Sequence, residues 1–330
     1  MGMSLAIGAC GGGGDDDGDD DGGSTVVDPA GTDTTWMVDT LLMPTSASEA
    51  TQLGLNLDGD ELGRKDNALG QIMAALAGAA GESFNINETI DESVRSGTLL
   101  LLVRMKATAL TTATGVGMWV YLGENESPAA CVDENDMVCG LHLDGAGSAD
   151  IKASSPTDAL VVGDNIAGRF EGGPGTLSLE LALTDGAPIS VELIGARAIA
   201  TIASDGATLS NGIIAGAITD SDLQGEVLPA VHSALTDSIA EDCTGTVPDC
   251  CEDGSTGATI VGLFDNAPAD CAVSLEEVKE SNLIKSLLTP DVDLLDAGGN
   301  YNPLSDGEKD SLSLGVGFTA ISGTFTIPAQ

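Results

Sequence analysis

The chain has 330 residues and a formal net charge of −41, from 52 acidic and 11 basic residues. Hydrophobic residues make up 42% of it and aromatic residues only 3%, so we expect a sizeable core built from Ala, Leu, Ile and Val. The negative charge repels nucleic acid and anionic lipid headgroups, which excludes both as electrostatic partners and favours divalent cations or cationic partners.

A short leader and an acidic tether open the chain. Ile7-Gly8-Ala9-Cys10 is an aliphatic residue, two small residues and a cysteine, and it resembles the lipobox of bacterial lipoproteins. The resemblance implies that residues 1–10 are a truncated signal peptide, that Cys10 carries lipid, and that the protein lies at the outer membrane or cell surface. Residues 11–33 contain the run Asp15–Asp21 and cannot bury apolar surface, so we expect a disordered Gly/Asp tether. An ordinary disordered N-terminus is the alternative.

The first part of the body reads as one strand followed by short helices. Thr34–Met43 alternates as a strand does. Ser46 and Glu49 form an S-x-x-E capping box for a short helix that stops at Gly54. Asn67 is expected to cap a helix over residues 68–80, whose apolar residues fall on one face, and a further short helix is expected over residues 87–96.

The period then changes to that of strands. Thr98–Met105 is a continuous apolar run, and Gly117–Leu122 alternates. Further strands are expected at Leu177–Leu183, Ile189–Leu193 and Ala198–Ala203, with turns at Asp185-Gly186 and Asp205-Gly206. A helix capped by Asp220 or Ser221, another over residues 274–288, and one or two strands within residues 311–327 complete the chain. This spacing is that of an antiparallel sandwich or barrel-like sheet.

The expected fold class is therefore mainly β. We predict one globular domain over residues 34–330, with an antiparallel β-sandwich-like sheet and several short helices, and with a Cys-rich insertion at residues 243–271. An α+β fold is the alternative.

Six cysteines follow the leader, at Cys131, Cys139, Cys243, Cys250, Cys251 and Cys271. One lipid-bearing cysteine and three disulfides account for all seven, as an oxidising compartment predicts. We expect Cys131 to pair with Cys139. Cys250 and Cys251 are adjacent, so each is expected to bridge outward, which leaves two connectivities with Cys243 and Cys271. A zinc site is the weaker alternative, because paired CxxC knuckles are lacking and no histidine is near.

An acidic loop precedes the second predicted helix. Oxygen-bearing side chains recur at Asn56, Asp58 and Asp60, with Asp66 further on and Glu61-Leu62 interrupting the pattern. The loop resembles the calcium loops of EF-hands, dockerins and thrombospondin type 3 repeats, in which a tight curl turns alternate oxygen ligands inward toward a hard cation. The resemblance implies a calcium site formed by these four residues.

Part of this pattern recurs near the C-terminus. At a constant offset of 244, Asn56 falls on Asn300, Asp58 on Asn302, Gly63 on Gly307, Lys65 on Lys309 and Asp66 on Asp310. A second calcium site is therefore expected at Asn300, Asn302, Asp306 and Asp310. Asp291, Asp293 and Asp296 are expected on a solvated surface, and would add ligands if they fold near this loop. The alternative for both loops is that Asn, Asp and Gly simply form turns.

Motifs of the common enzyme classes are absent from the sequence. It holds no G-x-S-x-G, H-E-x-x-H or Walker loop. His142 is expected in a strand and His232 beside the apolar stripe of a helix. Carboxylate-only catalysis, as in glycoside hydrolysis, needs no histidine, but such clefts are usually lined by aromatic residues, which are scarce here. Trp119 and Tyr121 lie on one side of a strand; core packing is expected, and stacking on a sugar is the alternative.

The sequence therefore favours a lipid-anchored extracytoplasmic surface protein, acting as a calcium-stabilised binding or structural module. Its expected partners are the membrane, through the lipid anchor, and a cell-surface protein or glycan, but not nucleic acid. A carboxylate-dependent glycan hydrolase is the alternative.

Overall fold

The computed structural model describes residues 28–80, 86–132, 139–181, 189–266 and 268–328. The lipobox-like residues, the tether up to residue 27 and the predicted turn at Asp185-Gly186 lie outside these ranges. The described strands are β1 (Thr32–Leu42), β2 (Leu101–Ala107), β3 (Ala113–Ser127), β4 (Ser148–Ile151), β5 (Leu160–Ile166), β6 (Arg169–Leu181), β7 (Ile189–Ile202), β8 (Thr208–Thr219), β9 (Ser311–Ser322) and β10 (Thr324–Phe325). The described helices are α1 (Ala47–Leu53), α2 (Ala68–Ala80), α3 (Ile86–Arg95), η2 (Leu141–Leu143), α4 (Asp220–Asp222), η3 (Leu223–Val227), α5 (Leu228–Asp242), α6 (Thr256–Phe264), α7 (Leu275–Glu280) and α8 (Asn282–Leu287). The prediction of a mainly β fold with several short helices is confirmed.

The main sheet closes on itself instead of splitting into the two layers of the predicted sandwich. Its strands follow the order β10-β4-β3-β2-β1-β9-β8-β7-β6-β5, and β5 pairs back with β3. In that closing pair Met118 lies opposite Val161 and Trp119 opposite Leu160. Register shifts interrupt β1, β6, β7 and β8, and such bulges bend strands sharply enough to close a sheet. The eight strands β3-β2-β1-β9-β8-β7-β6-β5 therefore form a closed barrel. Strands β4 and β10 extend the sheet beside β3.

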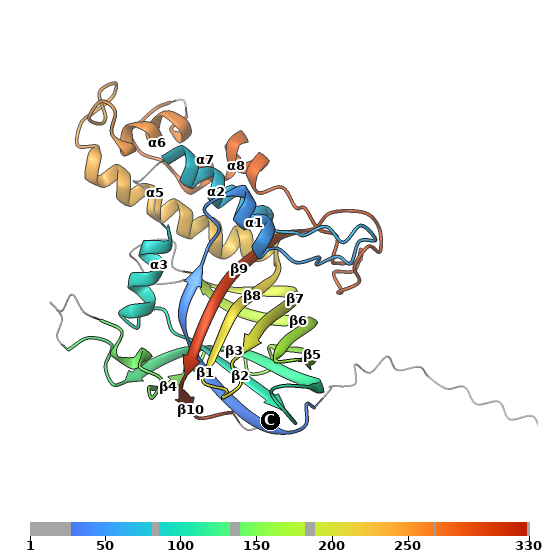
Figure 1. Ribbon diagram of the computed structural model, residues 1–330. Helices are drawn as coiled ribbons and strands as arrows, with labels where there is room; N and C mark the ends of the chain where they lie inside the picture. Colours follow the sequence, from blue (N-terminus) through green and yellow to red (C-terminus); the bar gives the residue numbers. More distant parts are fainter. Residues whose placement is uncertain (1–27, 81–85, 133–138, 182–188, 267, 329–330) are drawn as a thin grey trace, which may run out of the picture.

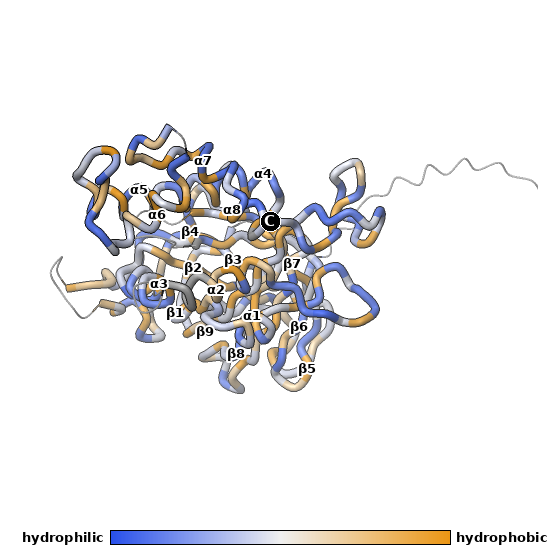
Figure 2. The backbone as a smooth tube through the Cα atoms, turned by 90° about the horizontal axis from the view of Figure 1, so that it is seen from above, coloured by the Kyte–Doolittle hydropathy of each residue, from blue (hydrophilic) through white to orange (hydrophobic). Residues whose placement is uncertain are grey.

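Side chains alternate between the barrel interior and its outer face. On β2, Leu101, Val103 and Met105 belong to the main buried cluster, whereas Leu102 belongs to a second cluster on the outer face. This two-sided burial explains why residues 98–105 read as a continuous apolar run instead of alternating. From above, hydrophobic stretches run through the strands and also reach some outer loops, and hydrophilic stretches are mostly in loops (Figure 2).

Helices close one end of the barrel. Ile72 of α2, Ile90 of α3 and Leu223 of η3 all join the cluster that fills the interior. Figure 1 shows these helices gathered at the same end, with α5 running across it. The predicted apolar face of α2 thus packs as a lid on the core, and so do the buried residues of α3. In the described part of the chain, no helix is both long and apolar enough to cross a membrane.

A second buried cluster lies on the outer face of β2 and β3. Trp119 and Tyr121 are at most 1% exposed there, which confirms that this pair packs in the core. The Arg104 guanidinium lies 4.2 Å from the centre of the Trp119 ring and pairs with Asp33 at 2.7 Å. Phe325 of β10 meets Tyr121 edge to face. The small strands β4 and β10 therefore cover aromatic residues that would otherwise face solvent.

The termini of four helices test the local sequence signals. Ser46 accepts the N–H of Glu49 and Gly54 is the C-cap of α1, as predicted, whereas the Glu49 carboxylate accepts the N–H of Thr45. Thr219 caps the helical stretch from residue 220, not Asp220 or Ser221, because its Oγ1 accepts the N–H of Asp222. The predicted helix over residues 274–288 is divided into α7 and α8, because Ser281 adopts a non-helical ψ of 129° and starts a new cap.

The expectation for His142 was wrong. His142 lies in the 3₁₀ turn η2 and not in a strand, since Gly140 takes a left-handed φ of 105° that breaks the extended backbone. It is fully buried, and burial lowers its pKa. The Cys-rich insertion contains the helix α6, which Ser255 caps.

The six cysteines outside the leader form three disulfides. Cys131 pairs with Cys139, Cys243 with Cys251, and Cys250 with Cys271. The adjacent cysteines each bridge outward, and of the two connectivities the structure has the one that joins Cys250 to Cys271. Two of these bonds tie α6 and its flanking loops to the end of α5, around a small core of their own that includes Ile239, Phe264 and Val278. The bonds thus hold a helical segment that buries little apolar surface.

Candidate functional site

Two long loops that carry the predicted calcium ligands lie together on the barrel. Residues 55–66 form the first loop and residues 292–310 the second, and we call them the paired loops. Their apolar residues Leu55, Leu57, Val292 and Leu294 join one buried cluster on the outer face of β7 and β8. Small residues of β8, Ala215 and Ala217, lie beneath them in the same cluster. Both loops project from the same side of the molecule (Figure 1, blue and orange-red).

The two loops close in the same way. In the first loop the N–H of Asp66 donates to the carbonyl of Leu55, and the Asp66 carboxylate accepts the N–H of Leu57 at 2.7 Å. In the second loop Asp310 donates to the carbonyl of Val292, and its carboxylate accepts the N–H of Leu294 at 3.1 Å. The predicted correspondence of Asp66 with Asp310 is therefore present in the contacts.

The first residues of the two loops do not follow the constant offset of 244 residues. Because Leu57 corresponds to Leu294 in these contacts, the residue equivalent to Asn56 is Asp293 and not Asn300. The second loop contains an extra turn, in which Asp296 accepts the N–H groups of Gly298 and Asn300. An insertion of this kind inside a loop is invisible to a superposition without gaps.

Within the first loop most predicted ligands accept backbone hydrogen bonds. Asn56 Oδ1 accepts from Gly59 and Asp60, and Asp58 Oδ1 accepts from Asp60 at 3.0 Å. Asp60 accepts the N–H of Arg64 and pairs with its guanidinium at 2.5 Å. These are the Asx-type contacts that hold tight turns. Glu61-Leu62 extends outward from this curl, and Leu62 is 79% exposed.

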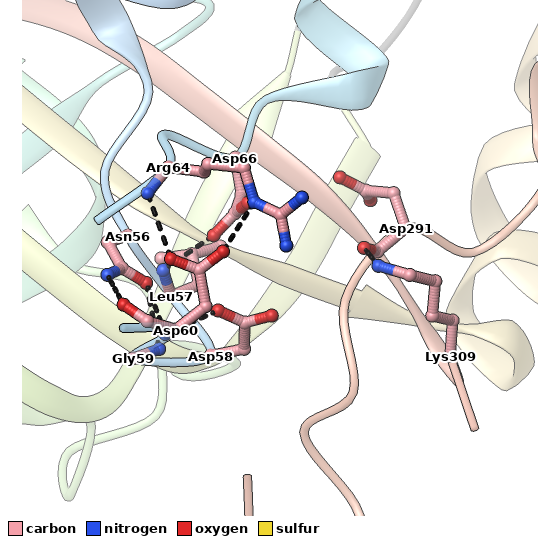
Figure 3. A network of polar contacts seen from close by, with 9 residues as sticks. All are labelled: Asn56, Leu57, Asp58, Gly59, Asp60, Arg64, Asp66, Asp291 and Lys309. Carbon is pink, nitrogen blue, oxygen red and sulfur yellow. Dashed lines mark hydrogen bonds and ion pairs between the residues drawn. The ribbon is translucent and has the colours of Figure 1, made fainter. Parts of the chain in front are cut away.

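Carboxylates of the first loop and Asp291, the residue before the second loop, lie near Asp66. Burial raises the pKa of Asp66, the hydrogen bond from Leu57 lowers it, and the charges of Asp58, Asp291 and Asp60 add to the rise, so that the pKa is about 6. Figure 3 shows this group, with Arg64 reaching past Asp60 toward the side where Asp291 lies. Hydrogen bonding to Asp60 raises the pKa of Arg64. One guanidinium thus faces several carboxylates, which leaves a local excess of negative charge.

The second loop buries an acidic side chain. Asp293 is 3% exposed, which corrects the prediction that it lies on a solvated surface. Its Oδ2 accepts the N–H of Gly307 at 2.8 Å, whereas its buried Oδ1 has no hydrogen-bond partner among the described residues. A buried carboxylate oxygen without a partner is costly. At the equivalent position of the first loop, Asn56 is neutral.

The remaining predicted ligands of the second loop are spread along it. Asn300 donates through Nδ2 to Asp296 in the extra turn. Asn302 donates its N–H to the carbonyl of Leu294, and Asp306 accepts the N–H of Glu308. Asp310 lies at the base of the loop, between Leu294, Leu295 and Ser311. In the described residues these side chains do not share a single set of contacts.

Strand β9 connects the paired loops to α2, a link that the sequence patterns missed. Ser313 Oγ donates to Asp291 at 2.6 Å and accepts the N–H of Ala68, the first residue of α2, at 2.7 Å. Asn67 binds both backbone groups of Gly315, at 2.8 and 3.0 Å. A Cβ at Gly315 would lie 2.3 Å from the carbonyl oxygen of Leu53, so only glycine fits there. Small residues at alternate positions of β9 were the available signal.

The paired loops are not a preformed metal centre. In the parts of the chain that the structure describes, no three His, Cys, Asp or Glu side chains are grouped so that they could hold a metal ion. Calcium at either loop stays a prediction.

Two cavities stand out elsewhere on the described surface. One, of about 320 Å³, lies at the barrel end opposite the helices and is lined by Leu110, Gly168 and Ile202 among others. The other, of about 430 Å³, contains Asp270 and Glu277. Hydrogen bonds from Ser274 and Asn266 lower the pKa of Glu277, and Asp270 accepts the N–H of Ala272. A general acid for glycoside hydrolysis needs the opposite shift.

No protein-family model, curated protein or solved structure matches the chain. Function is therefore inferred from the chain's own residues.

Proposed function

We propose that the protein is an extracytoplasmic surface module, anchored to a membrane by lipid on Cys10 and held away from it by the Gly/Asp tether. The pairing of all six other cysteines carries this proposal. Disulfides persist in oxidising compartments and are rare in the cytosol. The lipobox-like residues and the acidic tether support the same location independently.

Protein purified from its own cells tests the anchor directly. Mass spectrometry of protein purified from its own cells should find an N-terminal peptide that begins at Cys10 and carries acyl chains. Cys10→Ala should move the protein from the membrane fraction to the soluble fraction, whereas Cys131→Ala, a matched cysteine variant, should leave it in the membrane fraction. An unmodified amino terminus together with free sulfhydryls at the other six cysteines would contradict the proposal.

We further propose that calcium stabilises the paired loops. Three features support this: the carboxylates that lie near Asp66, the buried Asp293 oxygen without a partner, and the preference of calcium for carboxylate and carbonyl oxygen. Asp58, Asp66 and Asp291 at the first loop, and Asp293 and Asp310 at the second, would have to move closer together to hold the ion, because no three such side chains of the described residues are grouped for a metal. The ion would supply the positive charge that Arg64 provides only in part.

Thermal unfolding tests this second proposal. With calcium about a hundredfold above its dissociation constant, a site in the folded state adds about 2.7 kcal/mol to the free energy of unfolding. We expect the melting temperature to rise by several degrees in millimolar calcium relative to chelator, and not in sodium chloride of equal ionic strength. A melting temperature that is identical in calcium and chelator would remove calcium from the proposed function.

No observation on the described residues favours the glycan hydrolase. The two carboxylates found in a cavity, Asp270 and Glu277, act as acceptors for the backbone at a turn and at the cap of α7. The favoured role is therefore a binding or structural module.

A further inference from the structure

Apolar side chains are exposed on the paired loops. Leu62 is 79% exposed at the first loop, and Leu304 and Tyr301 are 51% and 41% exposed at the second. The other large exposed hydrophobic residues of the described chain are scattered over the barrel, the disulfide loops and the helices: Leu42, Val132, Leu141, Ile166, Val247, Leu263 and Leu283. The paired loops thus bring three of them to one side of the molecule.

The backbone at Leu304 is also unusual. Leu304 has a φ of +58°, a left-handed conformation that a leucine adopts rarely. Its N–H donates to the carbonyl of Asp293, so the conformation is fixed by the base of the loop. Leu304 therefore combines backbone strain with a side chain that leaves about half of its surface exposed. A contact outside the chain would account for the leucine.

Charge decides which partner these residues fit. The paired loops with Asp291 hold ten acidic residues against Arg64, Lys65 and Lys309. Glu61 lies beside Leu62, and Asp306 and Glu308 follow Leu304, all three exposed. A second copy of this chain, also at −41, and an anionic membrane are both repelled. A partner must therefore combine positive charge with apolar side chains.

We propose that the paired loops are a docking surface for a cationic amphipathic segment of another protein, with Leu62, Tyr301 and Leu304 contacting its apolar residues and the surrounding carboxylates its Lys or Arg residues. The inference rests on the proposed role as a surface module and specifies the partner of that module. Carboxylates steer and orient such a partner, and apolar contact supplies the selectivity for it.

The test compares two synthetic peptides by fluorescence anisotropy, with the full-length protein in chelator. One peptide repeats Lys and Leu, and the other repeats Lys and Ser with the same charge. Burial of two leucine side chains corresponds to at least about tenfold in affinity. We expect the protein to bind the Lys/Leu peptide at least about tenfold more tightly, and Leu62→Ser with Leu304→Gly to abolish this difference.

The variants are chosen to keep the fold. Leu62 is almost fully exposed, and glycine adopts the φ of Leu304 without strain, so the melting temperature should not fall. Ile166→Ser, which removes a residue 68% exposed on the β5–β6 turn, is the matched control and should keep the preference for the Lys/Leu peptide. Equal binding of both peptides by the unmodified protein, or a preference that survives the double variant, would overturn the docking surface. Neither outcome depends on lipid or calcium, so the anchor and calcium proposals are tested separately.

Discussion

Replacing Asn67 by alanine is expected to cost about 3–4 kcal/mol of folding free energy, because several buried hydrogen bonds depend on this one side chain. Asn67 is 2% exposed and precedes α2. Its Oδ1 accepts the N–H groups of Gly70 and Gly315, and its Nδ2 donates to the carbonyls of Ala50 and Gly315. Alanine would leave these buried backbone groups without partners, and α2 without its cap.

The consequence reaches beyond the helix. Asn67 follows Asp66, the residue that closes the first loop, and it binds β9 two residues beyond Ser313. Loss of Asn67 should therefore loosen the first loop, α2 and β9 together, and hydrogen exchange should accelerate in all three. Asn67→Asp is expected to be no better than alanine at neutral pH, because a carboxylate cannot donate to the two carbonyls and would be buried against them.

Asn87 provides the matched comparison. Asn87 lies in the first turn of α3 and exchanges two hydrogen bonds with the backbone of Met43, but it is only partly buried. Asn87→Ala should cost about 1 kcal/mol. Urea unfolding monitored by circular dichroism measures both variants. If Asn67→Ala costs no more than Asn87→Ala, the connection through Gly315 is not a structural anchor.

Asn67 also illustrates what the sequence reveals and what it does not. That this residue caps α2 could be predicted, because a capping side chain acts on the N–H groups that follow it in the chain. That it binds Gly315 could not, since this contact joins residues 248 positions apart. In the same way, the alternation on β2 and β3 predicted strands, whereas the β3–β5 pair that closes the barrel depends on bulges whose positions no local pattern marks.

The candidate site shows the same limit. The acidic loops were visible as spaced Asn and Asp residues, and the shared role of Asp66 and Asp310 followed from the repeat. The equivalence of Asn56 with Asp293 did not, because the second loop contains an additional turn. Arg64 as the counter-ion of Asp60 was equally hidden, since a lysine or arginine beside an acidic loop occurs on many surfaces without pairing.

Asp66→Asn is expected to stabilise the protein at pH 7 in chelator by about 2 kcal/mol. The pKa of Asp66 is raised from its ordinary value of 3.8 to about 6. Each tenfold change in proton affinity corresponds to about 1.4 kcal/mol, and the expected stabilisation is smaller than the full pKa shift implies because the side chain is only partly buried.

The penalty depends on pH. Below pH 3.8 both the folded and the unfolded protein hold the proton, and the full stability is present. As the pH rises toward 6 the unfolded chain loses its proton first, so stability falls, and above pH 6 the loss is complete. Asparagine keeps an acceptor for Leu57 without this penalty.

Calcium should reverse the advantage of that substitution. If the ion binds at the first loop, the unmodified protein should gain about 2.7 kcal/mol at a hundredfold excess over the dissociation constant, whereas Asp66→Asn should gain little, because it lacks a charged ligand. Asp205→Asn is the matched control, since Asp205 is an exposed turn residue that accepts the N–H of Ala207 far from the paired loops; it should respond to calcium as the unmodified protein does.

The measurement is urea unfolding from about pH 4 to 8, in chelator and in calcium. If the buried carboxylate of Asp66 destabilises the fold, the free energy of unfolding of Asp66→Asn should no longer fall as the pH rises to about 6. The response to calcium tests ion binding separately, so either hypothesis can fail without the other. Should Asp66→Asn respond to calcium as fully as the unmodified protein, the ion does not bind at Asp66.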